Sequence, residues 1–318
     1  MRIGKRLRNG LVASSVVLGG LVGLGGCGEK TKPSIETKNE TPVVALPGTN
    51  AGEKSIPQNG TETVRATDAK YLQSFEQAVI ADDIPDDQQP PPDKTLAGKA
   101  TGPIRAAVEK VWSQIAVADA KGEPIPFVVS LETSEGDIEI TLRPELAPNH
   151  TRNLIALIKS GFYEGLCFDR IIRESFTNAE GKMQQLHVLR GGCPLGTGDP
   201  GIGHLGYFMK PEFSSSEKHE EGTFGFWHDS EPATAGCRFY ITLTPAPTLD
   251  GDFTILGKVS KGLDIVKKIA SQPVQNPNSD PEREKPKEPV TIKKIKVTPD
   301  SVEIPVPVAQ NGSVRQTN

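Results

Sequence analysis

The sequence predicts a mainly β fold, a closed antiparallel barrel capped by two helices, and features of its second half lead to this prediction. Residues 127–132 and 137–142 alternate apolar and polar side chains around a Thr-Ser-Glu-Gly turn, which is typical of a hairpin. A helical pattern begins at Pro148, and further short apolar runs are separated by glycine-rich turns. A second helix at 263–270 and a last strand at 290–297 are expected near the end of this region.

The first residues have the pattern of a bacterial lipoprotein signal peptide, predicted over residues 1–26. A basic start is followed by an apolar run from Leu11 to Leu24 and then by Gly-Gly-Cys, so Cys27 is the predicted lipidation site. The run is shorter than the roughly 20 apolar residues of a membrane-spanning helix, which disfavours an uncleaved anchor. We therefore expect a lipid-anchored protein of the bacterial cell envelope, with its domain facing the periplasm or the exterior.

The segments around the domain differ in composition. Residues 27–66 are polar and lack aromatic side chains, and they are predicted to form a disordered tether. Residues 300–318 are predicted to form a disordered tail. Between tether and domain, residues 67–125 are expected to hold two short amphipathic helices, at 67–82 and 104–117, joined by a proline-rich linker. Such short helices are unstable alone, so they are expected to dock on a partner or, more simply, loosely on their own domain.

Several motifs follow one another in the predicted sheet. Phe168-Asp169-Arg170 and Gly191-Gly192 come first, and a Gly-Cys-Arg-Phe-Tyr-Ile run at 236–241 and a Leu-Asp-Gly run within 249–259 follow. In these motifs the chain resembles the cyclophilin family of peptidyl-prolyl isomerases from about residue 127 to 297, and several motifs in order are more specific than any single one. The resemblance implies an eight-stranded cyclophilin-like barrel over residues 126–299.

The resemblance also implies a set of site residues, with Arg170 as the catalytic residue. The residues that it places in the substrate-binding pocket are Phe176, His187, Val188, Arg190, Trp227, Arg238, Tyr240, Leu249 and Phe253. Some of them depart from the family pattern: His187 stands at a Phe position, Arg190 and Arg238 at Gln positions, and Trp227 at an Ala position. Phe176 is the alternative occupant of the Phe position, because the loop at 173–185 is longer than usual.

An arginine suits the chemistry that the resemblance implies. Rotation about a peptide bond faces a barrier of roughly 18–20 kcal/mol, because the nitrogen lone pair is delocalised into the carbonyl group. A catalyst needs an apolar slot for the proline ring and a fixed donor that stabilises the nitrogen as the bond twists. The planar, permanently charged guanidinium of Arg170 can hold the carbonyl and reach the prolyl nitrogen. The structural alternative for Arg170 is a surface ion pair with Asp169 or Glu174.

The substituted pocket positions raise two further expectations. Arg190 and Arg238 would place positive charges near Arg170, and these repel unless an acidic partner or an acidic substrate intervenes, so a preference for acidic peptides is one hypothesis. Trp227 either fills the pocket or is an ordinary core aromatic.

The cysteines and the net charge limit the disulfides, cofactors and partners that can be expected. With Cys27 lipidated at most one disulfide can form; Cys167 is expected to be a buried apolar residue, and Cys193 and Cys237, which flank implied pocket positions, are the expected pair. No zinc spacing is present, and the chemistry needs neither a metal nor another cofactor. The net charge of −4 disfavours nucleic acid as a partner.

The expected function is therefore that of a peptidyl-prolyl cis-trans isomerase that assists the folding of exported or envelope proteins. Its partners would be proline-containing segments of other proteins and, through the lipid, a membrane, and we expect a monomer. The alternative is a catalytically impaired, membrane-anchored peptide-binding module of the same fold. A third possibility is a structural envelope protein whose tether and helices carry the function.

Overall fold

The computed structural model describes residues 71, 73–82, 84–119, 121–177, 181–276 and 284–300. The predicted signal peptide with Cys27, the predicted tether and the predicted tail from residue 301 onward lie outside the described residues. None of the helices within these ranges has the length and apolar character that crossing a bilayer requires.

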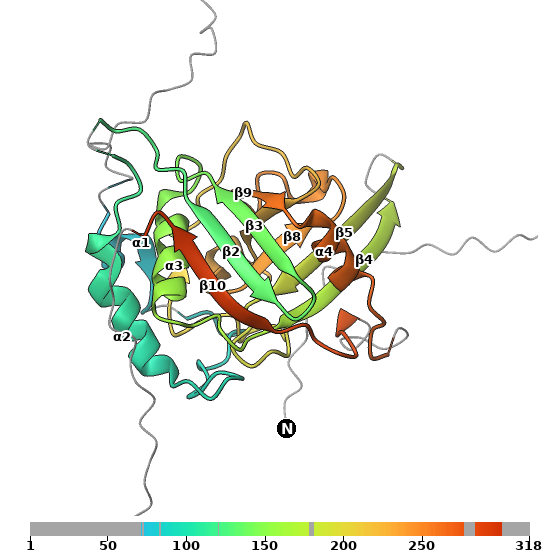
Figure 1. The fold of residues 1–318 in the computed structure, drawn as a ribbon, viewed down its shortest axis with the longest axis horizontal. Coiled ribbons are helices and arrows are strands. Elements are labelled where there is room, and N and C mark those ends of the chain that lie inside the picture. Colours follow the sequence, from blue (N-terminus) through green and yellow to red (C-terminus); the bar gives the residue numbers. More distant parts are fainter. Residues whose placement is uncertain are drawn as a thin grey trace, which may run out of the picture. The chain divides into compact units, whose positions relative to one another are not determined.

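An antiparallel sheet of eight strands forms the body of the described part of the chain (Figure 1). Its strands lie in the order β10-β2-β3-β9-β7-β8-β5-β4. Their bounds are Val128–Thr133 (β2), Asp137–Leu142 (β3), Phe168–Thr177 (β4), Met183–Gly191 (β5), Thr223–Phe226 (β7), Phe239–Thr242 (β8), Thr254–Lys261 (β9) and Ile292–Thr298 (β10). The predicted hairpin is confirmed in β2 and β3, where buried residues alternate with more exposed ones.

The prediction of a closed barrel is wrong, because the sheet curls into an open half-barrel with β4 and β10 at its two edges. Among the described residues these edges approach each other just before the two strands begin, at a bridge between Cys167 and Thr291. Beyond this point β4 runs on for ten residues that pair with β5 and leave β10 behind. Closure would need a continuous stagger of pairings around the sheet, and the long β4–β5 hairpin interrupts it.

The two predicted helices are confirmed as α3 (Pro148–Lys159) and α4 (Leu263–Ala270). Proline occupies the first turn of α3, where its missing N–H leaves no helical hydrogen bond unmade. The carboxylate of Glu212 accepts hydrogen bonds from the backbone N–H groups of Asn149 (3.1 Å) and His150 (2.9 Å). These donors have no partner within the helix, so Glu212 caps the buried α3 from a distant part of the chain.

The segment before the sheet belongs to the same core. It forms α1 (Phe75–Ala78), the two-residue strand β1 (Val79–Ile80) that pairs with β6 (Phe208–Met209), and α2 (Thr101–Val111). The ring of Trp112 is 2% exposed, and its Nε1 donates a hydrogen bond to the carbonyl of Gln73 (3.0 Å). Loose docking is therefore wrong: side chains of this segment are buried together with those of the sheet.

The proline-rich linker between α1 and α2 lies along the loop that follows β5. The N–H of Leu96 donates to the carbonyl of Pro194 (2.7 Å), and the N–H of Gln89 donates to the carbonyl of Gly201 (2.8 Å). The ring of His204 is hydrogen-bonded through Nε2 to the carbonyl of Gln89 (2.9 Å). These contacts fix a loop of the candidate site from outside the sheet.

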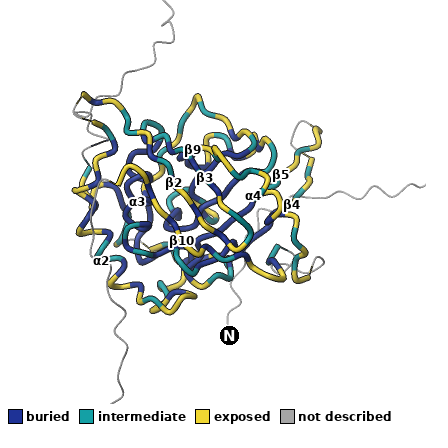
Figure 2. Tube along the Cα trace, in the orientation of Figure 1, coloured by how far each residue is buried: buried dark blue, intermediate teal, exposed yellow. Residues whose placement is uncertain are grey.

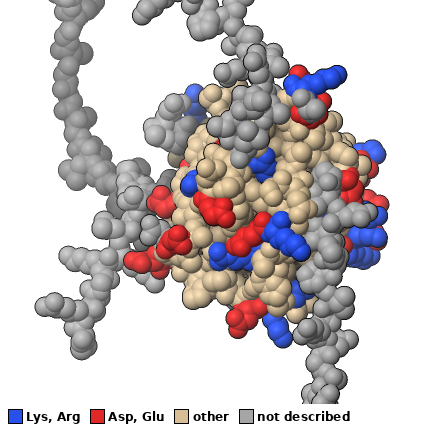
Figure 3. Space-filling model, turned by 90° about the vertical axis from the view of Figure 1, so that its left-hand side faces the viewer, with Lys and Arg blue, Asp and Glu red and all other residues tan. Residues whose placement is uncertain are grey.

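Burial differs between the centre and the ends of the sheet, and the surface charges are mixed in sign. Figure 2 shows buried backbone through α3 and the strands of the sheet, whereas the far ends of β4 and β5 are partly or fully exposed. Figure 3 shows the side of the molecule that carries α1 and α2, where acidic and basic side chains are interspersed. On α2 the guanidinium of Arg105 pairs with Glu109 one turn later (3.0 Å), a surface contact of small energetic weight.

The segment before the sheet provides a test of its structural role. Replacing Trp112 by Ala should lower the free energy of unfolding by about 3–5 kcal/mol, because a large buried ring is removed from a filled core. Urea denaturation would measure this change. The neighbouring Ser113→Ala, at an exposed position, should change it by less than about 0.5 kcal/mol. Equal stability of the two variants would mean that the segment is not part of the core.

Candidate active site

Residues implied for the site stand in one row across three strands. Arg170 on β4 is opposite Arg190 on β5, and Arg190 is opposite Tyr240 on β8. Residues directly opposite each other in a sheet share a face, so these three side chains leave the same face of the sheet. The next row on this face holds Ile172 and Val188.

An apolar cluster lies beside the arginines on this face. Its buried members are Ile172, Val188, Tyr240, Ala246, Leu249 and Phe253, and Leu186 and Trp227 pack against them. The ring of Trp227 is 4.9 Å from that of Phe253, and the rings of Tyr240 and Phe253 are 5.8 Å apart. We call this set the Tyr240 cluster. It brings together five of the predicted substrate-binding residues: Val188, Trp227, Tyr240, Leu249 and Phe253.

His187 and Phe176 lie outside the Tyr240 cluster: His187 is on the other face of the sheet, and Phe176 is on the same face but farther out. His187 is opposite Arg173, and alternation along β5 turns it to the other face from Val188. Phe176 is on the same face as Val188 but pairs with Gln184, two rows farther out on the β4–β5 hairpin. Phe176 was predicted within a loop at 173–185, whereas the structure has two long paired strands there; His187 was placed at a family Phe position, and the alternation of β5 turns it away from the pocket.

Arg170 is engaged by the loop that follows β5. Its Nη2 lies 2.9 Å from a carboxylate oxygen of Asp199, and its Nε donates to the carbonyl of Gly198 (3.2 Å). Lys285 contacts the same carboxylate at 3.0 Å, and the side chain of Arg170 is 3% exposed. Arg170 forms ion pairs with Asp199, whose carboxylate is partly exposed, and at 3.8 Å with Glu284. The guanidinium is therefore buried, whereas the alternative of an ion pair with Asp169 or Glu174 placed it at the surface.

Arg190 lies between a carbonyl, a carboxylate and an aromatic ring. Its Nη2 donates to the carbonyl of Gly198 (2.7 Å) and lies 3.6 Å from Asp169, and its guanidinium is 4.7 Å from the centre of the Trp227 ring. Burial, and then the nearby charge of Arg238, lower the pKa of Arg190 to about 10, and Asp169 opposes this change. Even so, Arg190 remains protonated at neutral pH and makes a cation–π contact with Trp227.

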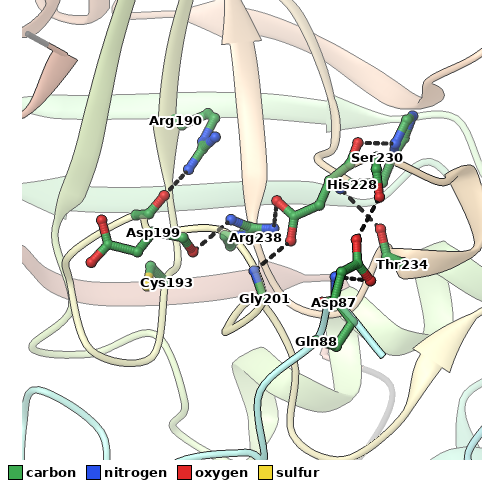
Figure 4. A network of polar contacts seen from close by, with 12 residues as sticks. Asp87, Gln88, Arg190, Cys193, Asp199, Gly201, His228, Ser230, Thr234 and Arg238 are labelled. Atoms are coloured by element: carbon green, nitrogen blue, oxygen red, sulfur yellow. Dashed lines mark hydrogen bonds and ion pairs between the residues drawn. The ribbon is translucent and has the colours of Figure 1, made fainter. Parts of the chain in front are cut away.

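Arg238 forms a buried ion pair within the site. Its Nη2 is 2.5 Å from the carboxylate of Asp229, and its Nη1 donates to the carbonyl of Asp199 (3.3 Å; Figure 4). Burial alone would lower the pKa of Arg238, but the Asp229 carboxylate outweighs burial and raises it above its usual value. Burial raises the pKa of Asp229, but the charge and hydrogen bond of Arg238, together with the N–H of Gly201 and the charge of Arg190, lower it below its usual value.

The acidic groups that separate the three arginines come from the chain itself. Asp169, Asp199 and Asp229 each contact one of them, as the preceding distances show. The expectation that acidic peptides are preferred rested on uncompensated positive charge. That charge is compensated, so the argument for an acidic substrate no longer holds.

The match to known proteins covers this sheet and site. Residues 128–297 match the model of the cyclophilin type peptidyl-prolyl cis-trans isomerase/CLD family, which is more than half of the chain. The chain belongs to the cyclophilin-type peptidyl-prolyl cis-trans isomerase family. The cyclophilin family is a family of isomerases, and the comparisons extend to plants, bacteria and a protozoan parasite.

Three of the proteins that the cyclophilin domain resembles illustrate this range. Peptidyl-prolyl cis-trans isomerase CYP18-2 of Arabidopsis thaliana is 32% identical over 161 residues, which are 51% of this chain and 90% of the plant protein. A probable peptidyl-prolyl cis-trans isomerase of Brucella suis is 31% identical over 166 residues, 52% of this chain and 83% of the relative. The crystal structure of a Cryptosporidium parvum cyclophilin type isomerase, 25% identical, covers 54% of this chain and 98% of its own, with a TM-score of 0.45.

In this cyclophilin domain, Gly198 and Asp199 are functional candidates that the sequence analysis missed. Gly198 has φ +65°, and a Cβ atom there would lie 2.6 Å from Cγ of Arg170. Only glycine fits this approach, which lets one dipeptide contact Arg170, Arg190 and Arg238. The run Gly-Thr-Gly-Asp-Pro-Gly at 196–201 was the signal that could have indicated a special loop.

The floor of the Tyr240 cluster contains a second set of residues that the sequence analysis missed. The Tyr240 hydroxyl is 2.7 Å from Nε2 of His219, and Nδ1 of His219 is 2.8 Å from the Asp250 carboxylate. Because Asp250 accepts from Nδ1–H, Nε2 of neutral His219 accepts the hydroxyl proton of Tyr240. Burial raises the pKa of Tyr240 well above its usual value, so it stays a donor.

The predicted disulfide between Cys193 and Cys237 is absent. Both are free and buried, as is Cys167, and burial raises the pKa of all three thiols, that of Cys167 to about 12. Buried thiols with raised pKa values are poor nucleophiles. Within the described residues, no group of three or more His, Cys, Asp or Glu side chains is arranged to hold a metal ion.

The buried histidines predict how stability depends on pH. Burial lowers the pKa of His204, His219 and His228 in the folded protein. The unfolded chain takes up these protons near pH 6.5, so stability is fully present above about pH 6.5 and is lost as the pH falls through the lowered folded values. The urea midpoint should therefore be lower at about pH 5 than at about pH 7.5.

A variant isolates one contribution to this dependence. His219→Gln removes one of the three groups and should flatten the change between the two pH values, whatever it costs in absolute stability. A wild-type midpoint that stays constant or rises on acidification would contradict the assignment of neutral, buried histidines.

Proposed function

We propose that this cyclophilin domain catalyses the cis-trans isomerisation of prolyl peptide bonds, with Arg170 as the catalytic residue. The observation that carries the proposal is the row of Arg170, Arg190 and Tyr240 on one face of the sheet, beside an apolar cluster. A proline ring would lie against the Tyr240 cluster, and the guanidinium of Arg170 would contact the carbonyl and the prolyl nitrogen. Since rotation requires loss of amide conjugation, a fixed donor at the nitrogen lowers the barrier.

Substrate entry in this proposal requires two side chains to move. Trp227 packs on the Tyr240 cluster and is partly exposed, so it can leave the cluster without unfolding the strands. Arg170 must exchange part of its contact with Asp199 for the substrate carbonyl. Substrate binding would offset the loss of both contacts.

The occupied state of Arg170 favours a second candidate, a peptide-binding module that isomerises proline peptides slowly. Its supporting observation is that Arg170 is 3% exposed and already paired with Asp199. In that case peptides would bind the Tyr240 cluster while the guanidinium remained on the carboxylate.

The Arg170 test separates the two candidates. The purified chain should accelerate isomerisation of a short proline peptide, and Arg170→Ala and Arg170→Lys should each reduce kcat/KM by about 10²–10³, because a fork donor is lost. Arg105→Ala, at a partly exposed surface arginine, should leave kcat/KM unchanged. If wild-type chain binds the peptide without accelerating its isomerisation, the binding module is the correct function.

We further propose that the protein acts as a lipoprotein on exported or envelope proteins in the bacterial cell envelope, as a monomer. The support is the leader pattern of residues 1–26 and the cysteine that follows it. Expressed in a bacterium, wild-type chain should appear in the membrane fraction, and Cys27→Ser should move it to the soluble fraction. Soluble wild-type chain, or an unchanged distribution of the variant, would contradict lipid anchoring at Cys27.

A further inference from the structure

The β4–β5 hairpin extends beyond the rest of the sheet. Strand β8 pairs with β5 from Val188 to Gly191, whereas β4 and β5 stay paired with each other as far as Thr177 and Met183. Residues 173–177 and 183–187 therefore form a two-stranded arm, which projects from the sheet in Figure 1. A two-stranded ribbon with no third strand beside it is only marginally stable by itself, so an arm of this length calls for an explanation.

The two faces of the arm differ in exposure. On the face that continues from Arg170 and Val188, all four residues are partly buried: Glu174, Phe176, Gln184 and Leu186. On the opposite face His187 is partly buried and the others are exposed: Arg173, Ser175, Thr177, Met183 and Gln185. Leu186 packs against the buried residues of the Tyr240 cluster. The sheltered face thus continues the face of the candidate proline site, and Leu186 and Phe176 are its apolar members beside Glu174 and Gln184.

The arm is tied to the domain at its base. Nη2 of Arg173 donates to the carbonyl of Gln272 (3.1 Å) and to that of Ala270 at the end of α4. The carbonyl end of a helix attracts a cation, so this contact fixes the direction in which the arm leaves the sheet. A platform with a fixed direction can bind a chain at a set distance from the Tyr240 cluster.

We propose that the sheltered face of the arm is an extension of the substrate site and binds an apolar side chain of the client polypeptide beside the proline. This inference rests on the proposed function of the Tyr240 cluster as the proline slot. The row of Phe176 lies two rows beyond that of Val188, or about 13 Å along the strand. An extended client spans about 3.3–3.6 Å per residue, so the residue held by Phe176 is about four positions from the proline.

The size of the arm face favours an unfolded client over a folded partner. Two apolar side chains, Leu186 and Phe176, offer far less area than the roughly 1,200–2,000 Å² that a specific protein–protein interface buries. A small patch that adjoins a proline slot suits a weak, additional contact with an extended segment. The client class is therefore a proline-containing segment with an aromatic or large aliphatic residue about four positions away.

The test compares binding and turnover of short and long peptides by the full chain. The probes are a peptide of about four residues around one proline and peptides of about twelve residues with Phe or Ser about four positions before or after the proline. Wild-type chain should bind a Phe peptide more tightly than its Ser counterpart on at least one side. Phe176→Ser should weaken binding of that peptide about fivefold by fluorescence anisotropy and leave the short peptide unchanged.

Met183→Ser is the matched control, because Met183 is on the same arm but on its opposite face and is 69% exposed. It should leave all affinities unchanged. Equal affinity of wild-type chain for Phe and Ser peptides on both sides, no effect of Phe176→Ser, or an equal effect of Met183→Ser would each overturn the arm site. Because affinity is measured apart from turnover, a chain that binds without accelerating isomerisation would refute catalysis and still decide the role of the arm.

Discussion

The site is organised by the burial of three guanidinium groups on one face of a sheet. Moving a charge out of water costs several kcal/mol, and three like charges side by side would cost more unless carboxylates and carbonyls surround them. The dipeptide Gly198–Asp199 provides much of this compensation, since two carbonyls and one carboxylate reach Arg170, Arg190 and Arg238. Removal of Asp229 would take from Arg238 the carboxylate that compensates its buried charge. The loop and the strands are therefore coupled: neither keeps its geometry without the other.

This coupling explains why the chain before the sheet is part of the domain. The linker ahead of α2 holds the same loop through Pro194, Gly201 and His204, and Trp112 on the C-terminal side of α2 is buried against Phe75 in the core. The candidate catalytic arginine is thus supported in layers, first by Asp199, then by the loop and then by the preceding segment. Trp227 links the arginines to the Tyr240 cluster, because its ring contacts Arg190 on one side and Phe253 on the other.

The sequence was informative where a residue's place follows from its own strand. Arg170 and Tyr240 lie in strand motifs whose neighbours set which face they occupy, and α4 begins and ends at the residues predicted for it. Prediction from the sequence failed where a contact between distant parts of the chain decides a residue's position. Strand pairing, which placed His187 on the far face and left the sheet open, is invisible in local pattern. The partners Asp199, Asp229 and His219 meet the site only after loops fold back, so no spacing along the chain reveals them.

The position of β10 affects the order in which the domain can assemble. This strand closes one edge of the sheet by pairing Val297 with Val129 on β2, so two strands that lie side by side are separated by almost the whole domain in sequence. Such pairing pays the entropy of closing a very long loop before it gains contacts, which makes folding slow. During synthesis from the N-terminus, β2 must wait with one edge unpaired until the last strand has emerged. An unpaired edge is a template for aggregation, and for this interval the chain would itself benefit from the kind of folding assistance proposed for it.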